Sequence, residues 1–385
     1  MVRIVITGDS HLNLYNQKLG SRLAKRRARI GAAWWQTIQY AIENKADIYI
    51  HTGDLFDQLS PRNPPRARVV EGFKELSDAG VEAFILAGNH EAPSSEMDGA
   101  SPHAVLAEAG LAKVFDLYSD FKQYNLTVDG VDISIAGMSY NRNLNPREDP
   151  LEDRMIPAGA ELNIAVLHYS IEGIAPPIWE EPSIKRSSIE ANSDIQLYAM
   201  GHIHQHHETK VNDSHILYPG GTERYNFGEC DKETGFIVVD YDSELDIRYI
   251  PTEPQPMKQV KLHTSHMDHG DINGSISSVI EEISHEDGLF QLVLEGSIPF
   301  QLYTEIDFTA IYTLGGSLNF YFECVDTIQP TGEGFDFTPS EGLNPRKRLE
   351  ETAMEAISKS QGEEQKIWQQ AMDYALNYYL KEKDG

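Results

Sequence analysis

The N-terminal stretch Arg3-Ile4-Val5-Ile6-Thr7-Gly8-Asp9-Ser10-His11 decides the fold, because an apolar run ends there in residues that bind metals. Short apolar runs bounded by turn signals predict buried strands. Four more apolar runs, at 47–52, 83–87, 163–167 and 196–200, end in Gly53-Asp54, Gly88-Asn89-His90-Glu91, Leu167-His168 and Gly201-His202-Ile203-His204. Open α/β sheets bind ligands beyond the carboxyl ends of their strands. The sequence therefore predicts that five strand ends converge on one metal centre.

The residues at these strand ends have the chemistry and spacing of ligands for two metals. Asp9 and His11 stand at i and i+2 just past a strand, where extended backbone turns both side chains to the same side. Asp54 can offer one oxygen to each metal. We expect one metal to be held by Asp9, His11, Asp54 and His204, and the other by Asp54, Asn89, His168 and His202.

This ligand set predicts both the metal and the reaction. Imidazole, carboxylate and amide oxygen together suit Mn²⁺, with Fe²⁺ or Zn²⁺ as alternatives, and the absence of a thiolate disfavours a structural zinc site. Two metals about 3.5–4 Å apart clamp a phosphate and acidify a water for in-line attack. We therefore predict two Mn²⁺ ions and phosphoester hydrolysis. Asp-x-His or Gly-Asp alone is a weak signal and Gly-Asn-His-Glu a moderate one, so the prediction depends on all five motifs occurring in order.

His90 follows a predicted ligand without being needed as one. We expect it to stabilise the transition state or to protonate the leaving oxygen, with Glu91 orienting it. Histidines beside the motifs are predicted to be core, surface or supporting groups: His51, His206 and His207. More distant histidines are predicted to lie on the surface: His103, His215 and those between His263 and His269.

Composition limits the class of protein. A chain of 385 residues predicts two or three domains. The sequence contains no run of 18 or more apolar residues, so we expect no membrane span. A strand that begins at Arg3 leaves no room for a signal peptide, so we expect a cytoplasmic protein, nucleoid-associated if the host is prokaryotic. The chain has two cysteines, Cys230 and Cys324, which fits a reducing compartment. The alternative is a single disulfide bond between them.

The net charge of −28 is unevenly distributed. Residues 1–90 contain 12 Lys+Arg and 9 Asp+Glu, so the acidity lies downstream. Positive charge beside a site attracts phosphate even on an acidic protein. We expect DNA contacts from arginines in two basic stretches, with a solvated helix face as the alternative: Arg26, Arg27, Arg62 and Arg66.

The chain divides into four predicted parts. Alternating strand and helix patterns predict an α/β domain over residues 1–250, with strands after residue 203 forming a second sheet packed on the first. Three prolines within 251–256 mark a boundary. Residues 257–330 predict a small α+β domain, and 331–343 a linker. Residues 344–385 predict a helical hairpin with a broad apolar stripe, which either packs on its own protein or binds a partner.

Three motifs carry a resemblance to a known family. The first reads Asp9-Ser10-His11-Leu12, and the second Gly53-Asp54-Leu55-Phe56-Asp57. The third is Tyr218-Pro219-Gly220-Gly221-Thr222-Glu223-Arg224, with Phe227-Gly228-Glu229 beyond it. The chain resembles the calcineurin-like metallophosphoesterase superfamily and, within it, the SbcD-type nucleases of double-strand-break repair and their archaeal and eukaryotic counterparts in meiotic recombination.

The resemblance implies a two-sheet sandwich with helices outside, a small α+β capping domain and a C-terminal helical hairpin. It also implies a Mn²⁺-dependent exonuclease and endonuclease that processes DNA ends as a homodimer built through its N-terminal helices. Residues 344–385 would bind the coiled coil of an SbcC-type ATPase. Three positions depart from the family pattern without removing a ligand: Asn13, Asp57 and Glu91. Asp57 stands where archaeal and eukaryotic relatives carry a second catalytic histidine, and we expect it, with Glu91, to support the ligands.

Two other functions compete with this interpretation. A stand-alone phosphoesterase acting on nucleotides or phosphoproteins would use the same metals, but it needs neither the extra domain nor the hairpin. A DNA-tethering scaffold with a degenerate site is disfavoured by the intact ligand set. A neighbouring gene for a long coiled-coil ATPase would favour the nuclease.

Overall fold

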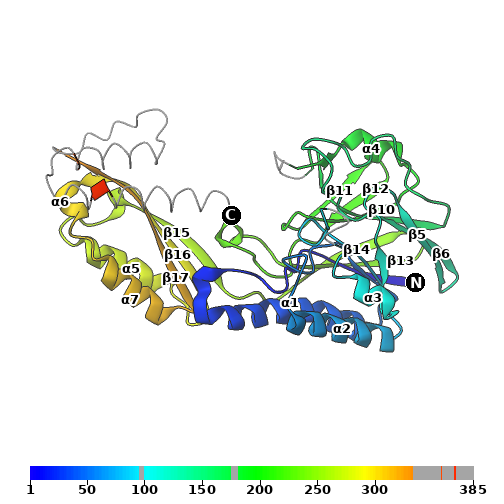
Figure 1. Cartoon of the computed structure of the whole chain (residues 1–385), viewed down its shortest axis with the longest axis horizontal. Coiled ribbons are helices and arrows are strands. Elements are labelled where there is room, and N and C mark those ends of the chain that lie inside the picture. Colours follow the sequence, from blue (N-terminus) through cyan, green and yellow to red (C-terminus); the bar gives the residue numbers. More distant parts are fainter. Residues whose placement is uncertain (95–98, 175–180, 333–356, 358–367, 370–385) are drawn as a thin grey trace. The chain divides into compact units, whose positions relative to one another are not determined.

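The computed structural model describes residues 1–94, 99–174, 181–332, 357 and 368–369. The chain forms two compact units, one of Met1–Gly296 with Glu305–Ile328 and one of Ser297–Thr304 with Gln329–Gly385. The predicted α/β class is confirmed, because the first unit contains two six-stranded mixed sheets with helices (Figure 1).

The first sheet is built around the N-terminal strand. Its order is β14 (Leu245–Pro251), β13 (Gly235–Tyr241), β1 (Val2–Thr7), β2 (Ile48–His51), β3 (Glu82–Leu86) and β4 (Lys113–Phe115). The strands from β1 to β4 run parallel, whereas β13 pairs antiparallel with β1. Three predicted ligand strands, β1, β2 and β3, are thus neighbours that end at the same edge of the sheet.

The second sheet supplies the other two ligand strands. Its order is β11 (His207–Val211), β12 (Ser214–Tyr218), β10 (Leu197–Gly201), β7 (Leu162–His168), β6 (Val131–Gly137) and β5 (Lys122–Val128). Strands β7 and β10 are parallel neighbours, with Gly201 opposite His168. Their carboxyl ends therefore also lie together.

The core lies in layers that follow the alternation of side chains along β1. Ile4 and Ile6 pack with Ile164 and Val166 of β7 in a cluster between the two sheets. Val5 points to the opposite face of the first sheet, where its cluster includes Trp34. A third cluster covers the outer face of the second sheet. The shared cluster packs the two sheets against each other and so fixes the strand ends of one sheet relative to those of the other.

Two long helices cover the outer face of the first sheet. Helix α1 (Leu23–Glu43) buries Ile30, Trp34 and Ile38, which lie four residues apart and so form one stripe. Helix α2 (Asn63–Asp78) has proline in its first turn, where the missing N–H costs little. Shorter helices complete the first 250 residues: η1 (Gln17–Arg22), α3 (Ala104–Glu108), α4 (Arg186–Ala191) and η3 (Phe227–Glu229). A small parallel pair joins β8 (Ser170–Ile171) to β9 (Ser183–Ile184).

Residues 257–331 form a separate three-stranded sheet. Its strands are β15 (Met257–His263), β16 (Leu289–Pro299) and β17 (Tyr321–Thr331). The helical elements of this segment are η4 (Thr264–His266), α5 (Ile272–Ile283), α6 (Phe300–Tyr303) and α7 (Phe308–Leu318). The α+β composition agrees with the sequence pattern, whereas the role of a capping domain stays a prediction, as do the domain boundaries.

Two details differ from the predictions. Strands β13 and β14 belong to the first sheet, because β13 pairs with the otherwise free edge of β1. His103, expected on the surface, is fully buried.

Three further predictions concern the C-terminal hairpin, the cysteines and membrane spans. The hairpin at 344–385 lies outside the described residues except at 357, 368 and 369. Cys230 and Cys324 are both free thiols. Among the helices that the structure describes, none is long and apolar enough to cross a membrane.

Candidate metal centre

The predicted ligands come together at the carboxyl ends of five strands. Asp9, Asp54 and Asn89 stand two or three residues beyond β1, β2 and β3. His168 ends β7, and His202 directly follows β10. The two sheets thus contribute to a single site, as the strand pattern predicts.

The backbone at this site is unusual at four predicted ligands. Asp9 (φ 47°), His11 (φ 46°), Asp54 (φ 51°) and His202 (φ 88°) all adopt the left-handed region. Non-glycine residues rarely occupy this region, and they do so mainly where the surrounding structure enforces it at functional sites. The chain therefore holds these side chains in place at a cost in backbone energy.

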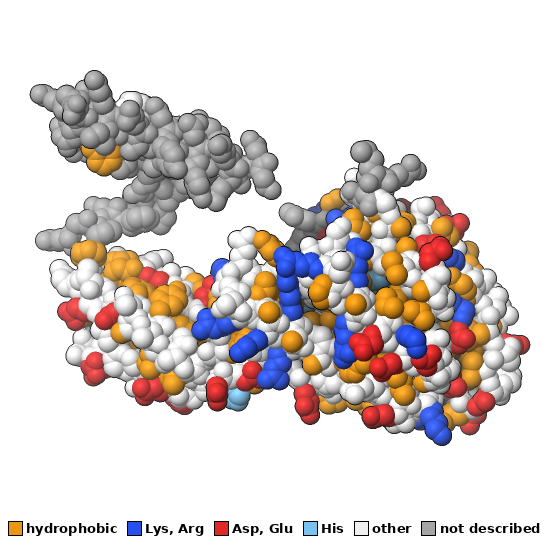
Figure 2. Space-filling model, turned by 60° about the horizontal axis from the view of Figure 1, so that its bottom comes forward, with side chains coloured by type: hydrophobic (Ala, Val, Ile, Leu, Met, Phe, Trp, Pro, Cys, Tyr) orange, Lys and Arg blue, Asp and Glu red, His pale blue; other side chains and the backbone are white. Residues whose placement is uncertain are grey.

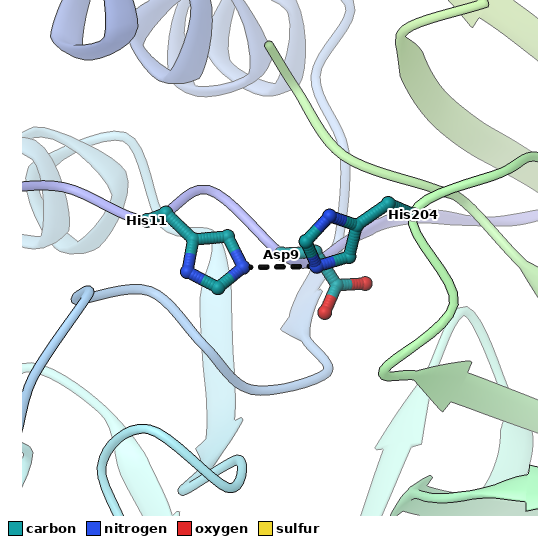
Figure 3. Close-up of side chains that lie close together, drawn as sticks. All are labelled: Asp9, His11 and His204. Carbon is teal, nitrogen blue, oxygen red and sulfur yellow. Dashed lines mark hydrogen bonds between the residues drawn. The ribbon is translucent and has the colours of Figure 1, made fainter. Parts of the chain in front are cut away.

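Asp9, His11 and His204 form the first cluster of ligand atoms, which lie within 4.8 Å of one another (Figure 3). The Nε2 atoms of His11 and His204 face each other at 3.0 Å. Asp9 Oδ1 accepts a hydrogen bond from the His202 amide at 3.0 Å, whereas its buried Oδ2 has no hydrogen-bond partner among the described residues.

The hydrogen bond made by Nδ1 of His204 determines which nitrogen of the ring carries the proton. Nδ1 of His204 lies 2.8 Å from Glu229 Oε1, and a carboxylate can only accept, so Nδ1 carries the proton. In the neutral ring, Nε2 then presents a lone pair toward His11 Nε2. A cation between the two nitrogens, beside the Asp9 carboxylate, would satisfy all three groups. Such carboxylate–imidazole pairs orient metal ligands in many proteins.

The second cluster contains Asp9, Asp54 and His168. His168 Nδ1 donates to the Thr52 carbonyl oxygen at 2.7 Å, so its Nε2 points inward, 3.0 Å from Asn89 Oδ1. His202 Nδ1 lies 3.3 Å from the same Asn89 oxygen. Nitrogen and oxygen lone pairs thus converge again, which fits the predicted second metal. Unlike the prediction, Asp9 approaches both clusters, with Oδ1 4.0 Å from His168 Nε2.

Asp54 lies between the clusters, as a bridging ligand requires. Its Oδ2 is 3.3 Å from His168 Nε2 and 3.9 Å from His11 Nε2, and its Oδ1 accepts from the His90 amide at 2.9 Å. Gly88 makes this approach possible, because a Cβ at that position would overlap both Asp54 Oδ1 and the His168 ring. The donor set present in the chain therefore fits a dinuclear metal centre.

Electrostatics also favour cations at the site. Burial raises the pKa of Asp54, but the imidazoles of His168 and His11 outweigh burial and hold this pKa well below its usual range. Burial lowers the pKa of His168, yet the charge of Asp54 dominates and raises it to about 9. Burial likewise lowers the pKa of His204, and the hydrogen bond to Glu229 and the charge of Asp9 raise it overall. The carboxylates around each ring therefore stabilise a positive charge there, which a metal can supply in place of a proton.

His90, the predicted catalytic residue, stands at the rim with its side chain 33% exposed. Its Nδ1 lies 3.1 Å from the Asp57 carbonyl oxygen and 3.8 Å from Asp57 Oδ1. Asp57 Oδ1 is also 3.4 Å from His11 Nδ1. Asp57 therefore lies beside both imidazoles, and its supporting role stays a prediction.

Glu91 differs from its predicted role. Its carboxylate accepts from the backbone amides of Phe56 and Gly88 and lies against His103, and none of its recorded contacts is with the His90 ring. Glu91 therefore holds two loops together rather than orienting His90.

Several supporting residues were not foreseen from the sequence. Glu229 lies in a family motif that predicts no role for it, and no sequence pattern indicates Glu181, whose Oε2 is 2.7 Å from His202 Nε2. Tyr225 places its ring 4.7 Å from His11, and Tyr140 stacks on His202 at 6.1 Å. Apart from Glu229, no motif marks these residues, because they come from segments outside the ligand motifs.

The four arginines predicted to contact DNA lie in different environments. Arg26 is 1% exposed and pairs with the buried Glu223, so its prediction as a DNA contact is wrong. Arg27 and Arg62 line a cavity of about 520 Å³ with Arg68 and with Leu12 and Asn13, which directly follow His11. Arg66 is partly buried. Figure 2 shows Lys and Arg side chains gathered on the face that carries α1 and α2, with hydrophobic and acidic side chains between them.

Comparison with known proteins shows which family the chain resembles. The family model for calcineurin-like phosphoesterases matches residues 2–206. A DNA double-strand break repair protein Mre11 from Methanopyrus kandleri is 29% identical over 255 residues, covering 63% of this chain and 54% of that protein. The Mre11 of Methanocaldococcus jannaschii is 30% identical over 249 residues, covering 62% and 63%. That of Sulfolobus acidocaldarius is 22% identical over 308 residues, covering 75% and 76%. The chain thus spans 54% and 63% of the length of the first two relatives.

Proposed function

Because the chain belongs to the calcineurin-like phosphoesterase family, we propose that it is a Mn²⁺-dependent nuclease that hydrolyses phosphodiesters at DNA ends. The observation that carries the proposal is the convergence of ligand lone pairs from five strand ends. The names of the relatives, DNA double-strand break repair proteins, support DNA as the substrate.

The residues of the chain divide the chemistry between them. Asp9, His11, Asp54 and His204 would hold one metal, and Asp54, Asn89, His168 and His202 the other. When bound, such a metal pair acidifies a water molecule and polarises the phosphate. The matching ligand chemistry favours Mn²⁺, with Fe²⁺ and Zn²⁺ as alternatives.

His90 would act on the leaving group. Its Nδ1 faces the Asp57 carbonyl oxygen at 3.1 Å, which leaves Nε2 to carry a proton to the departing oxygen. Asp57 stabilises the charged ring from behind, since its carboxylate lies 3.8 Å from Nδ1. General acid catalysis by a positioned histidine contributes about 10²–10⁴-fold.

Arg27 and Arg62 support binding of a phosphodiester backbone beside the site. Burial and the neighbouring charge of Arg62 both lower the pKa of Arg27. Two guanidinium groups that repel each other gain from a shared anion, so the cavity they line would bind a phosphate of the DNA strand.

Partner binding is proposed from the sequence pattern. The apolar stripe at 344–385 would bind the coiled coil of an SbcC-type ATPase, and the N-terminal helices would form a homodimer. The alternative is a stand-alone phosphoesterase, and the substrate test below separates the two activities.

The test measures hydrolysis of three substrates: end-labelled duplex DNA, end-labelled single-stranded DNA and an aryl phosphodiester. Each substrate is incubated with the protein in Mn²⁺ and with the protein after its metals have been removed by a chelator. We expect DNA degradation that depends on Mn²⁺ and falls about 10²–10⁴-fold in His90→Ala, while Mn²⁺ stoichiometry is retained. Activity that is unchanged in His90→Ala would refute the assignment of His90. Aryl-ester hydrolysis with DNA intact, both alone and with the ATPase added, would favour the stand-alone phosphoesterase.

A further inference from the structure

Glu91 is a fully buried carboxylate between the two loops that carry Asp54 and Asn89. Its Oε1 accepts from the Phe56 amide at 2.6 Å, two residues beyond Asp54. Its Oε2 accepts from the Gly88 amide at 3.2 Å, one residue before Asn89. A single side chain therefore ties the two loops through their backbones.

His103 closes this arrangement from a third segment. Its ring is 0% exposed, and its Nε2 lies 2.9 Å from Glu91 Oε2. The ring also stacks on Phe56, with centroids 6.1 Å apart and planes 20° apart. His103 thus contacts both the carboxylate and one of the residues that this carboxylate holds.

The two loops are joined in both directions. Asp54 reaches from the first loop to the amide of His90, and Glu91 reaches back from the second loop to the amide of Phe56. A carboxylate is required at position 91, because backbone N–H groups approach both of its oxygens and a carboxamide would place its own N–H groups against one of these donors.

We propose that Glu91 and His103 are positioning residues that set the separation of the loops carrying Asp54 and Asn89, and thereby the spacing of the metal pair. The proposal rests on the two-metal centre proposed above. Neither residue is one of the proposed metal ligands. They would act on the distance between the two loops. If one loop moves, the proposed bridging ligand Asp54 shifts relative to Asn89, which is proposed to bind only one metal.

Metal binding tests this directly, without substrate. The full-length chain, loaded with Mn²⁺, is measured by equilibrium dialysis for stoichiometry and affinity, and by electron paramagnetic resonance for the signal of a spin-coupled Mn²⁺ pair. We expect Glu91→Gln to weaken the second Mn²⁺ by about 10–100-fold and to reduce the coupled signal. His103→Asn should change both in the same direction.

Asp149→Asn is the matched control. Asp149 is 5% exposed and accepts from the Leu151 amide at 2.8 Å and from the Ser188 hydroxyl, in a segment without predicted ligands. The Asp149→Asn protein should lose thermal stability while it keeps the wild-type Mn²⁺ affinity and the signal of the coupled Mn²⁺ pair.

The outcomes separate the proposals. Wild-type Mn²⁺ affinity and coupled signal in folded Glu91→Gln would overturn the positioning role. If Glu91→Gln does not fold, Glu91→Asp and His103→Asn decide by the same two measurements, and unchanged values in both would overturn it equally. Fewer than two Mn²⁺ ions in the wild type would instead overturn the two-metal centre itself.

Discussion

Replacement of Glu229 by glutamine should weaken metal binding through His204. Glu229 Oε1 lies 2.8 Å from His204 Nδ1, and Oε2 accepts from the Tyr225 amide at 2.7 Å. A carboxylate satisfies both donors, whereas a carboxamide has one oxygen and must direct its NH₂ group at one of them. If the NH₂ group faces His204, the ring must move its proton to Nε2 and loses the lone pair that faces the metal.

The magnitude follows from the hydrogen bonds at stake. A buried donor without a partner costs about 1–3 kcal/mol. Loss of an outer carboxylate on a ligating histidine typically costs about 10–100-fold in metal affinity, or about 1.4–2.7 kcal/mol. The two values agree, so we expect Mn²⁺ affinity to fall by about this factor in Glu229→Gln.

Calorimetric titration of the chelated protein with Mn²⁺ measures this change. Glu233→Gln is the control, because Glu233 is exposed in the same loop and the same charge is removed. Without metal, Glu229→Gln should unfold at a lower temperature than Glu233→Gln, because one buried donor loses its partner, and the difference should widen when metal is present. Equal Mn²⁺ affinity in Glu229→Gln, Glu233→Gln and the wild type would refute the argument that Glu229 selects the tautomer of His204.

Four further predictions concern the site and the C-terminal segment. Gly88→Ala should abolish binding of one Mn²⁺ measured by dialysis, because its Cβ would overlap Asp54 Oδ1, and full stoichiometry would contradict this. Mn²⁺ affinity should rise as pH increases from about 6.5 to about 9, because the metal must displace a proton from His168, whose pKa is raised from 6.5 to about 9. Without metal, the stability that His168 contributes should be complete below pH 6.5 and disappear as pH rises through about 9, which urea unfolding measures and a pH-independent curve would contradict. Deletion of residues 345–385 should preserve Mn²⁺-dependent hydrolysis while abolishing co-purification with the ATPase, and retained co-purification would contradict the binding role of this segment.

Burial and pairing explain why some sequence predictions failed. Arg26 stands among basic residues that suggest an exposed surface, but the turn of α1 directs it toward Glu223, which is almost 200 positions away in the sequence. His103 has no local pattern to mark it as buried, and only its contact with Glu91 does so. Strand β13 has the same pattern in either sheet, so the free edge of β1 decides where it pairs.

By itself, the sequence determined the five strands and the order of the candidate ligands that follow them, because each motif is local: an apolar run, a turn and a candidate ligand a few positions apart. Tertiary structure alone decided which partners hold those ligands. Glu229 on His204, Glu181 on His202, and Glu91 with His103 between two loops all join residues of separate segments, which no single motif contains. Such contacts depend on sheet register and layer packing, which a local pattern constrains but does not specify.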